Sequence, residues 1–305
     1  MRSALLLFIS LSAHAAPTLT VFAEDGTPAA QGPAPRVLSG GVTQHDLSPD
    51  GRSVVSMEPT GLLLRTLDGG TPVTLAAPGS RFTVTPDSKF LVTFDTTFTR
   101  HSLASKDGKA TLARGLSPLP NSPLIASNSQ LVFVAADGSL QLADLVEGAA
   151  RQLPVEPPED KRCHNGAAVP SAISDDQNWL LYQHGCVFDV LRTDGSKARE
   201  LGFSSAQLVG TLVIGDLGAG EKGEATQLKV MELNTGAKWF IEGVRLHART
   251  VRIPGTENVL MHDEKGRVLF VELRPKRVKV LRDAAPPSVT VEPTKEGKAL
   301  VVTRD

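Results

Sequence analysis

The sequence has few of the residues on which nucleic-acid, carbohydrate or membrane-spanning proteins rely. Its 305 residues include only 11 Phe, 2 Trp and 1 Tyr, so surfaces on which bases or sugar rings stack are scarce. The 32 Lys and Arg are matched by 33 Asp and Glu without any basic block, which argues against general binding to nucleic acid. Beyond the first residues, no apolar stretch approaches the roughly 20 residues that a membrane helix needs. Composition predicts a soluble, nearly neutral globular protein with no nucleic-acid partner and no membrane span.

The N-terminal segment indicates export. Arg2 precedes an apolar run over 4–9, and an Ala-His-Ala stretch ends at Ala15. This order is typical of a cleavable secretory signal peptide, and its apolar run is too short to span a bilayer. We expect residues 1–15 to be the signal peptide and 16–305 to form a single domain. The mature chain is expected to be periplasmic or secreted.

Short β-rich runs recur about every 40 residues along the rest of the chain. The runs are Ser53–Ser56, Phe90–Thr93, Leu131–Val134, Leu180–Tyr182, Leu212–Ile214, Val259–Met261 and Ala299–Val302. A period of about 40 residues built from short strands is typical of a β-propeller, in which each blade has about four strands. The seven runs predict an all-β fold, a seven-bladed β-propeller.

A second set of apolar segments supports this count and indicates how the ring closes. Six of them follow the first six runs: Leu62–Leu67, Phe98–Leu103, Leu140–Leu145, Val187–Arg192, Leu228–Leu233 and Val268–Leu273. The seventh counterpart stands at the other end of the chain, at Leu19–Ala23, before an Asp-Gly pair. Asp-Gly between apolar strands is a hairpin signal, because Gly accepts positive φ. We expect the last blade to be closed by N-terminal outer strands and C-terminal inner strands, which leaves no free sheet edge at the junction.

Two turns carry a family resemblance. Leu47–Arg52 contains Ser-Pro-Asp-Gly-Arg, and Val84–Lys89 contains Thr-Pro-Asp-Ser-Lys. Both are similar to the turn of the WD-like propeller repeats in TolB-type periplasmic proteins, whereas the fifth blade has no such turn. The resemblance implies a propeller and leaves function open, since the same repeat occurs in partner-binding proteins, lyases and peptidase accessory domains. The chain departs from the TolB pattern of six blades and an additional N-terminal domain, so a role in that envelope complex is an analogy alone.

The propeller topology places both cysteines on one face. Cys163 falls in the crossing into the fourth blade, and Cys186 falls in the hairpin between the second and third strands of that blade. In an oxidising compartment this proximity predicts a disulfide. Closing the loop would stabilise the fold by roughly 3 kcal/mol in the chain-entropy model. The alternative is two unpaired buried thiols.

The longest crossing, 156–169, is the one that this disulfide would pin. We expect its charged part to contact a partner protein or peptide. The residues of this candidate interaction loop are Asp160, Lys161, Arg162, His164 and Asn165. The alternative is an exposed loop whose disulfide stabilises the fold and which binds no partner.

Polar residues near the channel mouth offer a second candidate site. They are His45, Asp46, Arg81, His184, His247, Arg249 and His262. Neutral imidazoles could bind a metal, with His184, His247 and His262 as ligands, and propeller lyases with similar repeats use channel histidines and a divalent metal. These histidines lack a carboxylate cluster and close ligand spacing, so we expect no metal, no cofactor and no catalytic residue.

The more specific enzyme motifs either do not occur or lack the secondary structure that they need. The segment Gly218–Gly223 matches G-x-G-x-x-G, but dinucleotide binding needs a helix next, and the pattern of Gln227–Leu233 predicts a strand. No G-x-S-x-G elbow, H-E-x-x-H helix or P-loop occurs. The sequence therefore favours an exported, monomeric, non-catalytic module for protein or peptide interaction. The alternative is a propeller enzyme, a lyase or lactonase that uses the channel-mouth histidines with a divalent metal.

Overall fold

The computed structural model describes most of the chain between Thr18 and Arg304. The described ranges are 18–22, 28–33, 44–48, 53–66, 71–103, 109–112, 117–120, 122–155, 168–196, 198–216, 227–246, 250–253, 256–263, 265–282, 289–293 and 299–304. The expected signal peptide, 1–15, lies outside these residues. No helix in the described ranges is long and apolar enough to cross a membrane.

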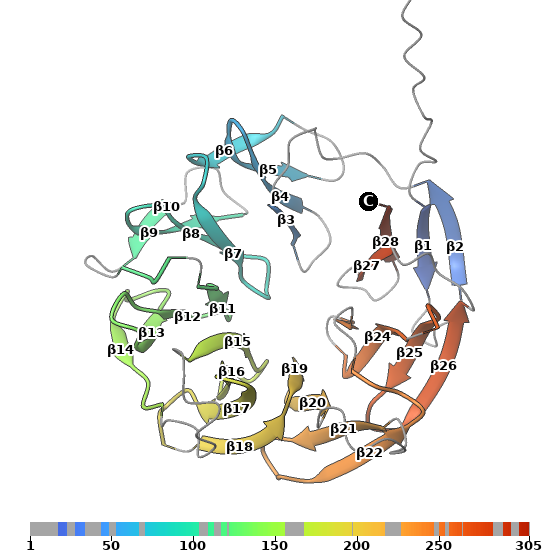
Figure 1. Ribbon diagram of the computed structural model, residues 1–305. Coiled ribbons are helices and arrows are strands. Elements are labelled where there is room, and N and C mark those ends of the chain that lie inside the picture. The colour runs from blue at the N-terminus through green and yellow to red at the C-terminus, as the bar shows by residue number, and fades with distance from the viewer. Residues whose placement is uncertain are drawn as a thin grey trace, which may run out of the picture.

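Within the described ranges the regular elements are β-strands, and they form seven four-stranded antiparallel sheets arranged in a ring (Figure 1). Sheet 1 consists of β3 (Gln44–Leu47), β4 (Ser53–Glu58), β5 (Gly61–Thr66) and β6 (Val73–Ala76). Sheet 2 consists of β7 (Arg81–Val84), β8 (Phe90–Phe94), β9 (Phe98–Ser102) and β10 (Lys109–Leu112). Sheet 3 consists of β11 (Ile125–Ala126), β12 (Gln130–Val134), β13 (Leu140–Asp144) and β14 (Ala150–Gln152).

The remaining sheets follow the same order from the ring centre outward, except that the last combines both chain ends. Sheet 4 consists of β15 (Val169–Ile173), β16 (Trp179–His184), β17 (Val187–Arg192) and β18 (Ala198–Phe203). Sheet 5 consists of β19 (Ser205–Val209), β20 (Leu212–Asp216), β21 (Gln227–Glu232) and β22 (Lys238–Glu242). Sheet 6 consists of β23 (Val251–Arg252), β24 (Asn258–His262), β25 (Val268–Glu272) and β26 (Arg277–Arg282). Sheet 7 consists of β27 (Val289–Pro293), β28 (Ala299–Arg304), β1 (Thr18–Phe22) and β2 (Pro28–Pro33).

The apolar runs whose burial the structure describes form strands that are buried on both faces. In β12, Leu131 and Phe133 belong to the core cluster shared with sheet 2, whereas Val132 and Val134 belong to the cluster shared with sheet 4. Successive side chains of a strand point to opposite faces, so a strand between two neighbouring sheets needs an unbroken apolar run. Each of the seven predicted runs lies in the second strand of its sheet, as the prediction required.

Sheet 7 closes the ring with strands from the two ends of the chain. β1 is antiparallel to β28, with Leu19 opposite Val301 and Val21 opposite Ala299. β2 then continues the sheet outward from β1, and β27 lies on the inner side of β28. The predicted combination of N-terminal outer strands and C-terminal inner strands is therefore present.

Candidate functional site

The two faces of the ring carry different connections. In each sheet the turn between the first and second strands and the turn between the third and fourth lie at the same end, because the first and third strands run in the same direction. We call this side the turn face. The opposite side, which carries the hairpins between second and third strands and the crossings between sheets, is the crossing face. The turn face holds a series of polar contacts between different sheets.

Two inner turns of the turn face share one hydrogen-bonded design. The Thr85 hydroxyl donates to the Asp87 carboxylate over 2.7 Å, and the Ser174 hydroxyl donates to Asp176 over 2.6 Å. Burial alone would raise the pKa of Asp176, but hydrogen bonds from Ser174, the Asn178 backbone and the Asn234 amide together lower it. Asp176 thus stays ionised and holds its turn in place.

Turns of neighbouring sheets are linked by side-chain acceptors. The Asp87 N–H donates to Asn128 Oδ1 over 2.8 Å, which joins sheet 2 to sheet 3. Gln177 Oε1 in sheet 4 accepts from the Ser127 hydroxyl over 2.8 Å and from the Ser129 hydroxyl over 2.6 Å, which joins sheet 3 to sheet 4. The inner rim of the turn face is therefore continuous from sheet 2 to sheet 4.

At sheet 5 the inner turn shrinks to Gly210 and Thr211, and an ion pair spans it. Arg252 of sheet 6 pairs with Asp175 of sheet 4 through both terminal nitrogens. Gly210 has φ of 66° and lies against this pair, because a Cβ built on it would be 3.6 Å from Arg252 Nη2 and 3.8 Å from Asp175 Oδ2. Only glycine accepts this conformation readily, so the short turn lets sheets 4 and 6 contact each other directly.

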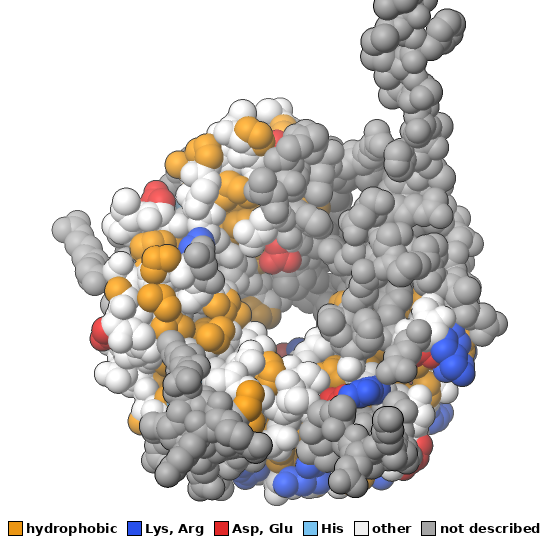
Figure 2. Space-filling model, in the orientation of Figure 1, with side chains coloured by type: hydrophobic (Ala, Val, Ile, Leu, Met, Phe, Trp, Pro, Cys, Tyr) orange, Lys and Arg blue, Asp and Glu red, His pale blue; other side chains and the backbone are white. Residues whose placement is uncertain are grey.

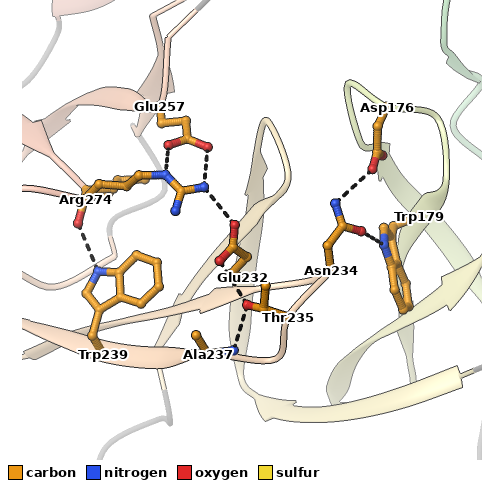
Figure 3. Close-up of polar contacts among 10 residues, drawn as sticks. Asp176, Trp179, Glu232, Asn234, Thr235, Ala237, Trp239, Glu257 and Arg274 are labelled. Atoms are coloured by element: carbon orange, nitrogen blue, oxygen red, sulfur yellow. Dashed lines mark hydrogen bonds and ion pairs between the residues drawn. The ribbon is translucent and has the colours of Figure 1, made fainter.

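The outer turns of sheets 5 and 6 are joined by a second group of charges (Figure 3). Arg274 donates to Glu257 and, over 2.8 Å, to Glu232 Oε1. The hydrogen bonds of Glu257 and then of Glu232 raise the pKa of Arg274, and the hydrogen bond of Arg274 lowers the pKa of Glu232. One arginine thus fixes two carboxylates from adjacent sheets.

Both tryptophans of the chain bind the next sheet through their indole N–H groups. Trp179 in β16 donates to Asn234 Oδ1 of sheet 5 over 2.9 Å, and Asn234 in turn donates to Asp176 over 3.2 Å (Figure 3). Trp239 in β22 donates to the carbonyl of Leu273 in sheet 6 over 2.9 Å. A buried indole needs an acceptor, so each ring is both packed and oriented. Together with the two arginine groups, these bonds make sheets 4 to 6 one connected unit on the turn face.

Few of the predicted channel-mouth residues fall where the structure describes them fully. Arg81 begins β7, donates through Nη1 to the Leu119 carbonyl over 3.1 Å, and has a buried Nη2 without a hydrogen-bond partner in the described structure. His184 ends β16 and is buried, and its Nδ1 also has no hydrogen-bond partner there. Asp46 is exposed on β3. For His45 on β3 and His262 on β24 the structure describes the backbone.

The other predicted site residues lie outside the described ranges. They are Asp160, Lys161, Arg162, Cys163, His164, Asn165, His247 and Arg249. Cys186 follows Gly185 in the turn between β16 and β17, on the crossing face as predicted. Its pairing with Cys163 stays a prediction. In the described ranges no group of three or more His, Cys, Asp or Glu side chains is placed to hold a metal ion.

Sequence reasoning missed the residues that join sheets 4 to 6. In the sequence, Asp175 and Asp176 indicate only a turn, and Arg274 indicates only the end of a strand. Their partners lie in other sheets, and Arg252 is 77 residues from Asp175. The available signal was the missing inner turn of the fifth blade, which is the site that this ion pair spans.

Four-stranded antiparallel sheets packed around a ring define a β-propeller. No family model and no curated protein matches the chain. Among solved structures it is similar to a chain from the crystal structure of the mitotic checkpoint complex, with 13% identity, a TM-score of 0.57, and coverage of 92% of this chain and 96% of that chain. It also matches BamB from Moraxella catarrhalis, with 16% identity, a TM-score of 0.46, and coverage of 93% and 91%. At such identities the likeness to the checkpoint-complex chain shows the fold alone, a β-propeller.

Proposed function

We propose that residues 16–305 form one seven-bladed propeller of the periplasm or cell exterior, which acts as a non-catalytic module for binding a protein or peptide. In this proposal the connected turn face is a rigid base, and the crossing face presents the loops that contact the partner. The loop 156–167, with Asp160, Lys161 and Arg162, is the contact segment.

The observation that carries this proposal is the anchoring of that loop at both ends. Leu153 and Ala168 are 1% and 6% exposed and belong to the same core cluster, between sheets 3 and 4. The partly buried Val155 packs against that cluster as well. A long charged segment held at its base by a packed core loses less conformational entropy on binding than a loop that is free at its base.

The disulfide between Cys163 and Cys186 is part of the same proposal. Cys186 stands in the tight turn after β16, which is the second strand of the sheet that the loop enters. A bond from this turn to Cys163 would fix the middle of the loop as well as its ends. Mass spectrometry of the exported protein before and after reduction tests it: two alkylated thiols without reduction would exclude the bond.

The function is tested by partner capture on the exported, oxidised protein. The variant Asp160→Ala/Lys161→Ala/Arg162→Ala is expected to lose proteins that the wild type retains from a periplasmic extract, measured by quantitative mass spectrometry. A matched variant, Thr71→Ala/Glu147→Ala/Lys265→Ala, changes three exposed residues in other loops and should retain them. Equal denaturation midpoints establish that all three proteins are folded. Unchanged capture by the loop variant would remove this loop from the proposal.

A further inference from the structure

The outer strand of sheet 6, β26, differs from the other outer strands whose side chains the structure describes. It pairs with β25 on one side, and no other described strand pairs with its outer edge. Residues 277–280 are all exposed, whereas β18 and β22 bury some of their side chains. The outer strands β6 and β14 have only four and three residues. A long exposed edge strand offers backbone N–H and C=O groups to another chain.

The two faces of β26 have different chemistry. Val278 is opposite Val271, and Val280 is opposite Leu269. Cross-strand partners share a face, and both inner residues belong to the core cluster between sheets 5 and 6. Val278 and Val280 therefore extend this apolar face outward, where they are 40% and 41% exposed.

The opposite face of β26 is basic. Arg277 is opposite Glu272, with which it forms an ion pair of 2.8 Å, and Lys279 is opposite Phe270. The segment 276–282 contains four Lys or Arg residues and no Asp or Glu. Lys and Arg side chains are visible along the rim at the position of β26 (Figure 2).

The two faces of β26 indicate what kind of segment could pair with its outer edge. An added strand would place alternate side chains on the two faces, so its apolar residues would lie beside Val278 and Val280 and its acidic residues beside Arg277 and Lys279. A second copy of this chain fits poorly, because pairing two β26 edges would bring cations close to cations. We propose that β26 binds an extended segment of another protein in which acidic and apolar residues alternate, by addition of that segment to the edge of sheet 6.

The probe is a fluorescein-labelled peptide with four alternating Glu-Val pairs, titrated into the purified full chain and followed by anisotropy. Saturable binding is expected. A peptide of the same composition with its Glu and Val residues in blocks should bind at least about 10-fold more weakly, because its side chains no longer match the two faces. A peptide N-methylated at every second residue should lose binding to a similar extent, because strand addition requires backbone hydrogen bonds. Equal binding of all three peptides would mean simple charge attraction and would overturn the proposal.

Two variants test whether β26 is the strand that binds the peptide. Val278→Glu/Val280→Glu should weaken binding at least about 10-fold by placing carboxylates against the apolar residues of the peptide. The matched control is Phe240→Glu, which alters a side chain that is 46% exposed on β22, the outer strand of the adjacent sheet, and should leave binding unchanged. Denaturation midpoints verify that both variants fold. Equal binding by the wild type and the β26 variant, or self-association of the chain through this edge in sedimentation, would overturn the proposal.

This proposal does not depend on the one for the crossing face. The variant at 160–162 should bind the Glu-Val peptide like the wild type, because the altered residues belong to a different sheet junction. Failure of partner capture with retained peptide binding, or the reverse, therefore identifies which proposal is wrong.

Discussion

Sheets 4 to 6 and sheet 1 place their polar groups in different environments. In sheets 4 to 6 the ion pairs of Arg252 and Arg274 stand on the turn face, where Arg274 is partly exposed, and the core clusters that join these sheets consist of apolar side chains. In sheet 1 an ion pair lies inside. Similar ion pairs therefore have different structural roles. On the turn face they connect one sheet to another. In the interior each charge needs the other, because a buried charge without its partner is destabilising.

The polar group of sheet 1 lies on one face of β4 and β5. Val55 and Met57 of β4 pack toward sheet 2, so Ser56 and Glu58 point away from that sheet. The Ser56 hydroxyl donates to Glu58 Oε1 over 2.9 Å, and Arg65 donates to the Ser56 oxygen over 2.6 Å and pairs with Glu58. The Arg65 and Glu58 side chains are only 13% and 7% exposed.

The largest effect is expected from breaking this buried group. Glu58→Ala leaves the Arg65 cation buried beside a hydroxyl, which should lower the free energy of unfolding by about 3 to 5 kcal/mol. Chemical denaturation measures the loss. The double variant Glu58→Leu/Arg65→Met removes both charges and should recover most of the stability. If Glu58→Ala lowered the free energy of unfolding by less than about 1 kcal/mol, the Glu58–Arg65 pair would contribute no more than an exposed ion pair does.

A smaller effect is expected from the apolar contact of sheets 4 and 5. A Cβ built on Gly215 of β20 would come within 2.7 Å of Cε2 in the buried ring of Phe203. Gly215→Ala should therefore cost about 1 to 3 kcal/mol through overpacking, measured by the shift of the denaturation midpoint. Phe203→Leu in the same chain should recover part of this loss. Additive losses in the double variant would contradict the direct contact.

A single indole hydrogen bond between sheets 4 and 5 should contribute less. Trp179→Phe keeps most of the packing but leaves Asn234 without its donor, which should cost about 1 kcal/mol. In a double-mutant cycle measured by chemical denaturation, Trp179→Phe and Asn234→Ala should be less than additive.

The matched control for this cycle is Trp239→Phe. It removes an indole bond to the Leu273 carbonyl and not to Asn234, so its loss should be additive with that of Asn234→Ala. If the two cycles gave the same coupling, the bond from Trp179 to Asn234 would have no specific role in joining the sheets.

The smallest effect is expected from the exposed charges of the turn face, and it depends on pH. The pKa of Glu232 is lowered by its hydrogen bond with Arg274, so this bond stabilises the folded chain above the ordinary pKa of the carboxyl and is lost as pH falls through the lowered value. The wild type should exceed Glu232→Gln in stability by up to about 1 kcal/mol near pH 7. Denaturation from about pH 7 to pH 3 should show this difference shrinking below about pH 4.5. A difference that grows on acidification would contradict the assignment.

The sequence predicted the arrangement of strands because their apolar runs are set by local periodicity. The run at Leu131–Val134 is apolar throughout because both of its faces are buried, and Asn234, Thr235 and Gly236, a turn-forming combination, connect β21 to β22. The strand predicted after the glycine-rich segment is β21, which supports rejecting a dinucleotide site there. Such features depend on neighbours in sequence, and this is why one sequence suffices to find them.

The contacts that join the sheets could not be predicted in the same way. Arg252 and Asp175 meet because the inner turn of sheet 5 is short, and Glu58 meets Arg65 because two strands pair in one register. Both depend on the placement of side chains after the sheets have packed. The histidines depend on packing in the same way: His45, His184 and His262 lie on strands of three different sheets, so only the packing of these sheets sets the distances between their side chains.

The split seventh sheet has a consequence for the order in which the protein is made. β1 (Thr18–Phe22) is synthesised well before its neighbour β28 (Ala299–Arg304). At about 5 to 20 residues per second, roughly 15 to 55 s separate the two strands on the ribosome. During that interval the edge of β1 that will receive β28 is an unpaired strand edge, the kind of edge that can pair with another chain.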